Sequence, residues 1–115
     1  MSLLGDGLMR RLLFICSRNR LRSPTAERVF ADYPGVETTS AGLAPDAEER
    51  LSADHIEDAE LIFVMEQAHR TKLARRFGSL LKGKKVICLD ITDSYQYMQP
   101  ELVALLKARV TPHLR

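Results

Sequence analysis

Short apolar runs alternate along the chain with stretches in which apolar residues recur at helical spacing. Three of the runs are almost continuously apolar, as is typical of strands that are buried on both faces of a sheet. They predict strands over residues 11–16, 60–65 and 85–89. A fourth segment, 36–40, is rich in β-branched residues and is predicted as a further strand.

Helix signals fill the segments between these strands. Ser23 offers a hydroxyl suited to an N-cap, and Pro24 is suited to the first helical position. Apolar residues then recur at helical spacing until Pro34-Gly35, which ends the predicted helix. The remaining predicted helices are a short one over 52–58 capped by Ser52, one over 67–77, and one that Pro100 opens.

Strands that alternate with helices predict a parallel α/β sheet covered by helices on both faces. The length of 115 residues predicts a single domain. Residues 1–8 carry no periodicity and are expected to form a loose leader, which leaves 9–115 as the domain. Ligands of such sheets bind beyond the carboxyl ends of the strands, where two polar segments follow predicted strands, 16–23 and 90–99.

The composition excludes several classes of protein. The chain is 45% hydrophobic and 28% charged, which is a globular rather than a disordered balance. Its two cysteines cannot build a disulfide scaffold or a four-cysteine zinc site, and its three histidines lack ligand spacing, so no metal is expected. No apolar run exceeds five residues, so no membrane partner is expected; without a signal peptide, the expected location is cytoplasmic.

Charge is unevenly distributed along the chain. The net charge is +4 over residues 1–30, −8 over 31–60 and +6 over 61–115. The basic first segment favours an anionic ligand. Nucleic-acid binders usually combine a strongly basic domain with interleaved aromatic residues, whereas only 6% of this chain is aromatic, so nucleic acid is not the expected partner.

The segment after the first predicted strand holds Cys16 and, after five intervening residues, Arg22. A loop of this length between strand and helix can direct successive backbone N–H groups at one point, which makes an anion site. Such a site stabilises a thiolate, the nucleophilic form of cysteine, and the Arg22 fork matches two oxygens of a phosphoryl group. Asn19 tolerates the left-handed backbone that a tight loop needs. The alternative is a core cysteine that only ends a strand.

The sequence LLFICSRNRLRSPTAE at 12–27 resembles the opening of the low-molecular-weight protein tyrosine phosphatase family. The family signature is a Cys-x5-Arg-Ser loop with a central asparagine, followed by Pro-Thr-Ala-Glu. Ser40-Ala-Gly42 and the run 61–65 resemble further family segments, so the resemblance covers most of the chain from residue 9 onward. It implies a three-layer α/β sandwich with a four-stranded parallel sheet flanked by helices.

The resemblance also implies a function, that of a cysteine-dependent phosphomonoesterase of the protein tyrosine phosphatase type. Cys16 would form a phosphocysteine intermediate without any cofactor, and Arg22 would clamp the phosphate. Ser23 would hydrogen-bond the thiolate, while Asn19 and Ser40 would brace the loop. The implied phosphate-binding residues are Ser17, Arg18, Asn19, Arg20, Leu21 and Arg22. A phosphorylated protein or a small phosphate ester would be the substrate, and inorganic phosphate the product.

The family carries a general acid in an Asp-Pro motif after its last strand. Asp93 occupies that place here, with Ser94 instead of the proline and Tyr95 matching the aromatic residue that follows. Asp90 is the rival candidate. The acid would protonate the leaving group while Cys16 attacks phosphorus, and would then activate water to release phosphate. It is needed because a tyrosyl oxygen, with a pKa of about 10, leaves poorly unless it is protonated.

Three features depart from the family pattern. The chain is shorter between its third and fourth strands. The loop interior carries Arg18 and Arg20, where the family usually has glycine and a small apolar residue. One expected pocket wall is the acidic segment 43–50, which holds no aromatic residue to stack on a tyrosyl ring, so the preference for phosphotyrosine stays open. Tyr95 and Tyr97 either furnish one pocket wall or pack their own loop down.

Two other functions fit the same loop. One is a catalytically weak anion-binding module that recognises a phosphorylated partner or RNA through residues 16–22. The other is a phosphocysteine carrier of a sugar phosphotransferase system; Arg22 weighs against it, because a clamp tuned for hydrolysis shortens the life of a carried phosphate. Asp93 favours the enzyme over both. An arsenate reductase would need two further cysteines, whereas only Cys88 remains, and that residue is expected to lie in the core.

Overall fold

The computed structural model describes residues 9–114, so the predicted leader, 1–8, lies outside the described residues. The strands are β1 (Arg10–Cys16), β2 (Val36–Gly42), β3 (Leu61–Val64) and β4 (Lys85–Cys88). The α-helices are α2 (Arg22–Phe30), α3 (Ala53–Asp58), α4 (Gln67–Phe77) and α5 (Pro100–Val110). Short 3-10 turns, Gly78–Leu81 and Thr111–Leu114, follow α4 and α5. Within this described part, no helix is long and apolar enough to cross a membrane.

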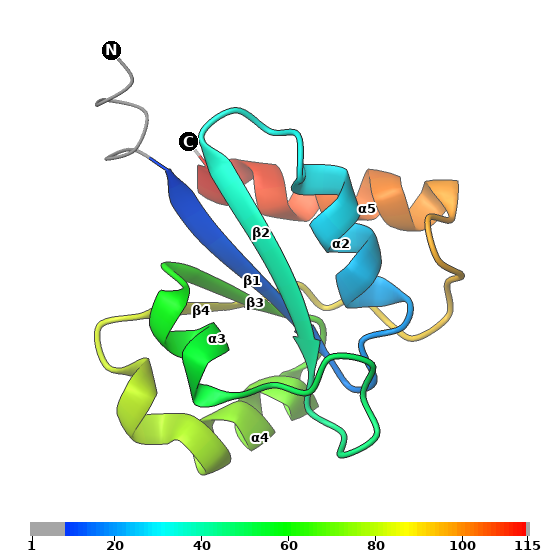
Figure 1. Cartoon of the computed structure of the whole chain (residues 1–115). Helices are drawn as coiled ribbons and strands as arrows, with labels where there is room; N and C mark the ends of the chain where they lie inside the picture. Colours follow the sequence, from blue (N-terminus) through cyan, green and yellow to red (C-terminus); the bar gives the residue numbers. More distant parts are fainter. Residues whose placement is uncertain (1–8, 115) are drawn as a thin grey trace.

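The four strands form one parallel sheet in the order β2-β1-β3-β4. Helices α2 and α5 cover one face of this sheet, and α3 and α4 cover the other (Figure 1). The predicted three-layer α/β sandwich is therefore confirmed. Because all strands run in the same direction, the loops that follow β1 and β4 both lie at the carboxyl ends of the strands.

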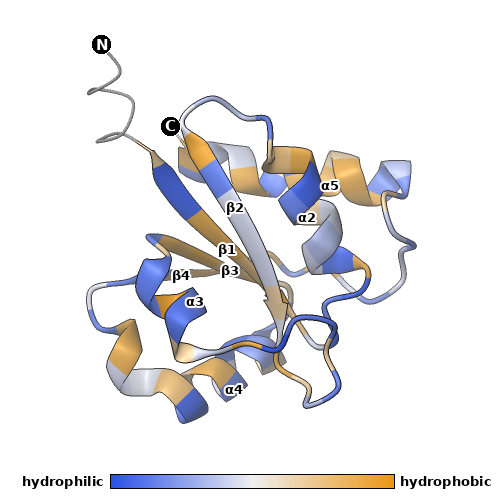
Figure 2. Ribbon diagram, in the orientation of Figure 1, coloured by the Kyte–Doolittle hydropathy of each residue, from blue (hydrophilic) through white to orange (hydrophobic). Residues whose placement is uncertain are grey.

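Strand β1 anchors the core on both faces of the sheet. Leu12 and Phe14 pack on the side of α2 and α5, whereas Leu13 and Ile15 pack on the side of α3 and α4, and all four are 0–1% exposed. Figure 2 shows the resulting apolar ribbons of β1 and β3 in the middle of the sheet. Burial of each such side chain contributes roughly 1.5–3 kcal/mol. Cys16 therefore ends a strand that is held firmly from both sides.

The prediction that Ser23 caps the helix and Pro24 opens it is wrong. Helix α2 begins two residues earlier, at Arg22, and Leu21 stands at the N-cap. The Ser23 hydroxyl oxygen lies 2.9 Å from the Cys16 sulfur instead. Ser23 lies inside the first turn of α2, where its hydroxyl contacts the sulfur and accepts a hydrogen bond from the Asn19 side-chain amide.

Strand β4 is less buried than its apolar run predicts. It lies at the edge of the sheet, where Lys85 is exposed and the next three residues are only half-buried. An edge strand has one neighbour instead of two, so helices cover it less completely. Cys88 is consequently not a fully buried core residue: it packs at the margin of the core beneath α3 and α4, and burial raises the pKa of its thiol.

Candidate active site

The cysteine loop (residues 16–22) joins β1 to α2 at the carboxyl ends of the strands. Cys16 is 4% exposed, and its sulfur lies at a cavity of about 480 Å³. The residues that line this cavity are Cys16, Ser17, Arg18, Arg20, Leu21, Arg22 and Asp93. Cysteine, arginine and aspartate thus meet in one cavity, as the positions of the two polar segments predict.

The backbone of the cysteine loop directs its carbonyl groups and its N–H groups to opposite sides. The carbonyl groups of residues 16–18 accept hydrogen bonds of 2.8–3.0 Å from N–H groups of the segment 43–48. In a trans peptide the N–H points opposite to the carbonyl, so the N–H groups of 17–19 point away from that segment. The Asn19 N–H does donate to the Cys16 sulfur, at 3.2 Å. Backbone N–H groups arranged in this way can bind an anion, as in a nest.

Gly42, the last residue of β2, permits this close approach of the two segments. A Cβ atom at this position would lie 2.6 Å from the Ser17 carbonyl oxygen, which is backbone and cannot rotate away. Strand β2 extends to Gly42, beyond the predicted end at Ser40, and pairs it with Cys16. Ser40-Ala-Gly42 therefore supports the cysteine loop through the shape of its last residue as well as through the serine.

Buried polar side chains brace the loop from behind. Asn19 has a left-handed backbone, with a φ of 57°, as predicted. Its side-chain amide donates to the hydroxyl oxygens of Ser23, at 2.9 Å, and Ser40, at 2.8 Å. Because the Ser23 oxygen accepts from Asn19, its own proton is free to point at the Cys16 sulfur 2.9 Å away. The Ser40 hydroxyl in turn donates to the carboxylate of Glu27, a residue to which the sequence assigned no role.

Arg22 is buried, at 4% exposed, and is held by groups from two other segments. Its Nη1 donates to the Glu66 carboxylate and to the Ile91 carbonyl oxygen, the latter at 2.7 Å. A buried guanidinium needs such a counter-charge. Glu66 is the N-cap of α4 and follows β3, so it also lies at the carboxyl ends of the strands. Sequence reasoning missed it, although an acid directly after a buried strand is the signal that could have found it.

His69 is a second residue that the sequence did not single out. Its Nδ1 accepts the Glu66 backbone N–H at 3.1 Å, so its proton resides on Nε2, which donates to the Ser17 hydroxyl oxygen at 3.1 Å. Burial, together with the nearby positive charge of Arg22, lowers the pKa of His69 to about 4. His69 is therefore neutral at pH 7 and holds Ser17 at the cavity wall.

Asp93, rather than Asp90, lies at the cavity. The Asp93 carboxylate is 3.8 Å from Nε of Arg22, and its side chain is 69% exposed. Asp90 lines a different hollow, beside β4 and α5. The predicted aromatic wall does not form in this arrangement: neither Tyr95 nor Tyr97 lines the cavity. Tyr95 packs against the core beneath α2 and α5, and Tyr97 is 51% exposed.

Arg18 and Arg20 are among the residues that line the cavity, and both also reach the acidic segment. The Nε atom of Arg18 lies 4.0 Å from the Asp46 carboxylate, and that of Arg20 lies 3.3 Å from the Glu48 carboxylate. All four side chains are about half exposed or more. The two features that depart from the family pattern, an arginine-rich loop and an acidic wall, are thus neighbours that pair with each other.

No family model and no curated protein matches the sequence. Among solved structures, YwlE arginine phosphatase from Geobacillus stearothermophilus is 24% identical, with 91% of this chain and 92% of that chain covered and a TM-score of 0.73. Wzb from Vibrio vulnificus, in complex with benzylphosphonate, is 22% identical, with 91% and 97% covered and a TM-score of 0.74. Low-molecular-weight protein tyrosine phosphatase from T. tengcongensis is 20% identical, with 90% and 99% covered and a TM-score of 0.71.

The chain has the low-molecular-weight phosphatase fold. At these identities the likeness establishes the fold. Within this phosphatase fold, the cysteine loop occupies the place between the first strand and the following helix that the sequence resemblance implied. The described residues contain no group of three or more side chains that could hold a metal ion.

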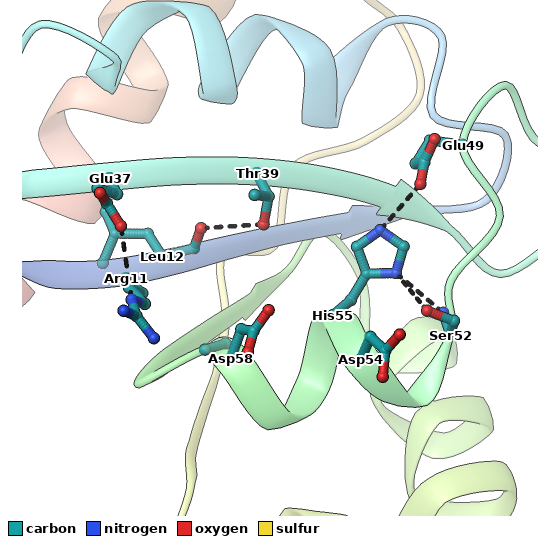
Figure 3. A pocket seen from close by; sticks show the side chains of 10 residues that line it. Arg11, Leu12, Glu37, Thr39, Glu49, Ser52, Asp54, His55 and Asp58 are labelled. Carbon is teal, nitrogen blue, oxygen red and sulfur yellow. Dashed lines mark hydrogen bonds and ion pairs between the residues drawn. The ribbon is translucent and has the colours of Figure 1, made fainter.

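A larger cavity, of about 570 Å³, lies elsewhere in this phosphatase fold, between β1, β2 and α3 (Figure 3). Four of the side chains that line it are carboxylates, those of Glu37, Glu49, Asp54 and Asp58. These charges repel a phosphate ester. His55 bridges the rim, with its Nδ1 accepting the Ser52 N–H at 3.0 Å and its Nε2 lying 3.1 Å from the Glu49 carboxylate. The smaller cavity at Cys16 is therefore the candidate active site.

Proposed function

We propose that this protein is a cysteine-dependent phosphomonoesterase of the protein tyrosine phosphatase type. The observation that carries the proposal is the surroundings of the Cys16 sulfur: a backbone N–H at 3.2 Å, a hydroxyl at 2.9 Å and the Arg22 guanidinium lining the same cavity. Each of these groups stabilises negative charge on sulfur or on a phosphoryl group beside it. A cysteine that merely ends a strand needs none of them.

The first chemical step would transfer the phosphoryl group to sulfur. The Cys16 thiolate attacks phosphorus, the S–P bond forms, and the P–O bond to the leaving group breaks. Nη1 of Arg22 is taken by Glu66 and Ile91, so Nε and Nη2 remain for two phosphoryl oxygens. Asp93, on the open side of the cavity, gives its proton to the leaving oxygen.

The second step would hydrolyse the phosphocysteine. Water attacks phosphorus, the Asp93 carboxylate takes a proton from that water, and the S–P bond breaks with its electron pair returning to sulfur. Inorganic phosphate is the product. An intermediate of this kind is supported by a solved variant of YwlE arginine phosphatase, 24% identical to this chain, whose active-site serine is phosphorylated.

Phosphorylated proteins or small phosphate esters are the proposed substrates. Three of the similar solved structures are an arginine phosphatase, YwlE, and two tyrosine phosphatases, AmsI from Erwinia amylovora and Wzb from Escherichia coli. We propose further that residues 9–115 act as one cytoplasmic domain that needs no cofactor and binds neither membranes nor nucleic acid. The rival function, an anion-binding module without turnover, has no use for Asp93 beside Arg22.

Turnover of p-nitrophenyl phosphate tests the proposal. Replacement of the nucleophile in Cys16→Ser should lower kcat by more than about a thousandfold. Cys88→Ser is the matched control, because Cys88 is the other cysteine of the chain and lies outside the cavity; it should retain turnover. Mass spectrometry after acid quenching should find a phosphate adduct on Cys16 alone. Retained turnover in Cys16→Ser would refute the mechanism, and phosphate binding without turnover in the unmodified protein would favour the binding module.

A further inference from the structure

The cavity at Cys16 is cationic beyond what the phosphoryl transfer requires. Three arginines line it against a single carboxylate, that of Asp93. The charge of Arg22 is already offset by its ion pair with Glu66, in which the arginine is buried and the carboxylate is partly exposed. The surplus positive charge therefore comes from Arg18 and Arg20, whose side chains have no part in the proposed two steps.

The acidic partners of these two arginines are easily displaced. The pairs Arg18–Asp46, at 4.0 Å, and Arg20–Glu48, at 3.3 Å, are exposed, and exposed ion pairs contribute little to stability. They are also not needed to hold the acidic segment in place, because main-chain hydrogen bonds of 2.8–3.0 Å between residues 16–18 and 43–48 already do so. An anion that enters the cavity can thus exchange with the Asp46 or Glu48 carboxylate without disturbing the loops.

The cavity offers little to an uncharged aromatic group. Leu21 is the one aliphatic side chain among the lining residues, and no aromatic side chain is among them. Apolar contact therefore contributes little of the binding energy beyond the phosphate. A cationic leaving group, such as a guanidinium, would be repelled by Arg18 and Arg20. Charge attraction to a second anion is the interaction that these walls can supply.

On the basis of the proposed phosphatase function, we infer that Arg18 and Arg20 form a second anion subsite, and that the substrate is a phosphate monoester with a carboxylate or a further phosphate beside the scissile group. The phosphoryl group occupies the nest at Cys16 and Arg22. The second anion lies at the rim, where it replaces Asp46 or Glu48 as the partner of the two arginines.

A matched pair of substrates isolates this charge. Para-(carboxymethyl)phenyl phosphate and para-(carbamoylmethyl)phenyl phosphate have nearly the same shape and leaving group, but only the first carries a second anion. The protein should prefer the carboxylate by about tenfold in kcat/KM at low ionic strength, the gain expected from a charge-assisted contact at the rim. High salt should shrink the preference, because exposed charges are screened.

Variants then assign the preference to the two arginines. In Arg18→Gln/Arg20→Gln the ratio of the two kcat/KM values should fall to about one, whatever happens to the individual values. Arg75→Gln, which removes an exposed arginine of α4 outside the cavity, should keep the ratio of the unmodified protein. A ratio near one in the unmodified protein, or a ratio that persists in the double variant, overturns the subsite.

A second pair of substrates identifies the source of the anion. Phosphotyrosine peptides with glutamate or glutamine on both sides of the phosphotyrosine repeat the comparison in a protein-like context. A preference for glutamate that disappears in the double variant supports acidic phosphoproteins as substrates. A preference confined to the small esters supports a small phosphate ester that carries a second anionic group. Absence of turnover of every compound would overturn the phosphatase function, and the subsite with it; turnover without charge preference would overturn the subsite alone.

Discussion

The two loops that meet at the candidate active site differ in how firmly they are held. In the cysteine loop, the three residues Cys16, Asn19 and Arg22 are 4–6% exposed, and each makes hydrogen bonds to groups behind the loop or beside it. The acid loop (residues 90–99) is mostly exposed, and Asp93 has a side chain that is 69% exposed. The functional residues of the cysteine loop are thus buried, whereas Asp93 of the acid loop is exposed to solvent.

The acid loop is anchored near its two ends. At its start, the Ile91 N–H donates to the Met65 carbonyl at 2.8 Å. At its end, the Met98 N–H donates to the Thr25 hydroxyl oxygen at 3.0 Å. Asp93 lies between these anchors. The geometry is therefore fixed by buried contacts where the phosphoryl group would bind, whereas the exposed Asp93 leaves room for leaving groups of different shape and, later, for a water molecule.

Displacing the cysteine loop should lower the activity toward all substrates strongly. In Gly42→Ala the new methyl group would meet the Ser17 carbonyl oxygen at 2.6 Å, so the cysteine loop must shift. A displacement of this kind should lower kcat/KM by about a hundredfold for every substrate alike, because it misaligns the nucleophile. Gly78→Ala is the control: this glycine is helical, with a φ of −50°, and has open space around it, so activity should not change. Steady-state kinetics on two phosphate esters checks this, and a substrate-selective loss would contradict it.

Removing the acid should lower kcat/KM by different factors for different substrates, unlike a displacement of the cysteine loop. Asp93→Asn should lower kcat/KM for phosphotyrosine by about a hundredfold but for p-nitrophenyl phosphate by less than about tenfold, because only the tyrosyl oxygen needs a proton in order to leave. Asp90→Asn, on the same loop but outside the cavity, should leave this ratio unchanged. Equal losses on both substrates would exclude Asp93 as the acid.

The contrast between the loops also explains which parts could be predicted from the sequence. Cys16, Asn19 and Arg22 lie within seven residues between a buried strand and a helix, so local pattern and chain geometry place them together. Glu66 and His69 reach the same site from 44 and 52 residues away in sequence, through contacts that depend on strand order. No spacing within the chain encodes that order.

Tertiary contacts also override local sequence signals. Ser23 satisfies the rule for an N-cap, but its hydroxyl is taken by Cys16 and Asn19, and the helix begins earlier. Likewise, the apolar run of β4 resembles that of a central strand, and only its place at the sheet edge leaves Cys88 half-buried. In both cases local propensity is correct as a tendency and tertiary structure decides the outcome.

A smaller effect should follow from loosening the start of the acid loop. Nη1 of Arg109, on α5, donates to the carbonyl oxygens of Leu89 and Asp90, each at 2.6 Å. Arg109→Met removes both bonds and should lower kcat/KM for phosphotyrosine by up to about tenfold, with less effect on p-nitrophenyl phosphate, because only the acid is misplaced. Arg109→Lys should restore part of the loss, since an ammonium can donate to both carbonyls. A purely structural role would lower kcat/KM for both substrates by the same factor and would lower the melting temperature as well.

The last prediction concerns stability rather than kinetics: His69, beside the cysteine loop, should make the free energy of unfolding depend on pH. Its pKa of about 4 lies below the ordinary 6.5, so between these values the unfolded chain binds a proton that the folded protein does not. The free energy of unfolding should therefore fall as the pH falls through this window, by about 3 kcal/mol between pH 7 and pH 4 from this residue. Urea denaturation at both pH values should show that His69→Gln loses this component. His55→Gln, which removes the equivalent ring at the start of α3, should retain it. An acid-dependent loss of the same size in His69→Gln would mean that this imidazole, and with it the fixed Ser17 wall, is not held neutral.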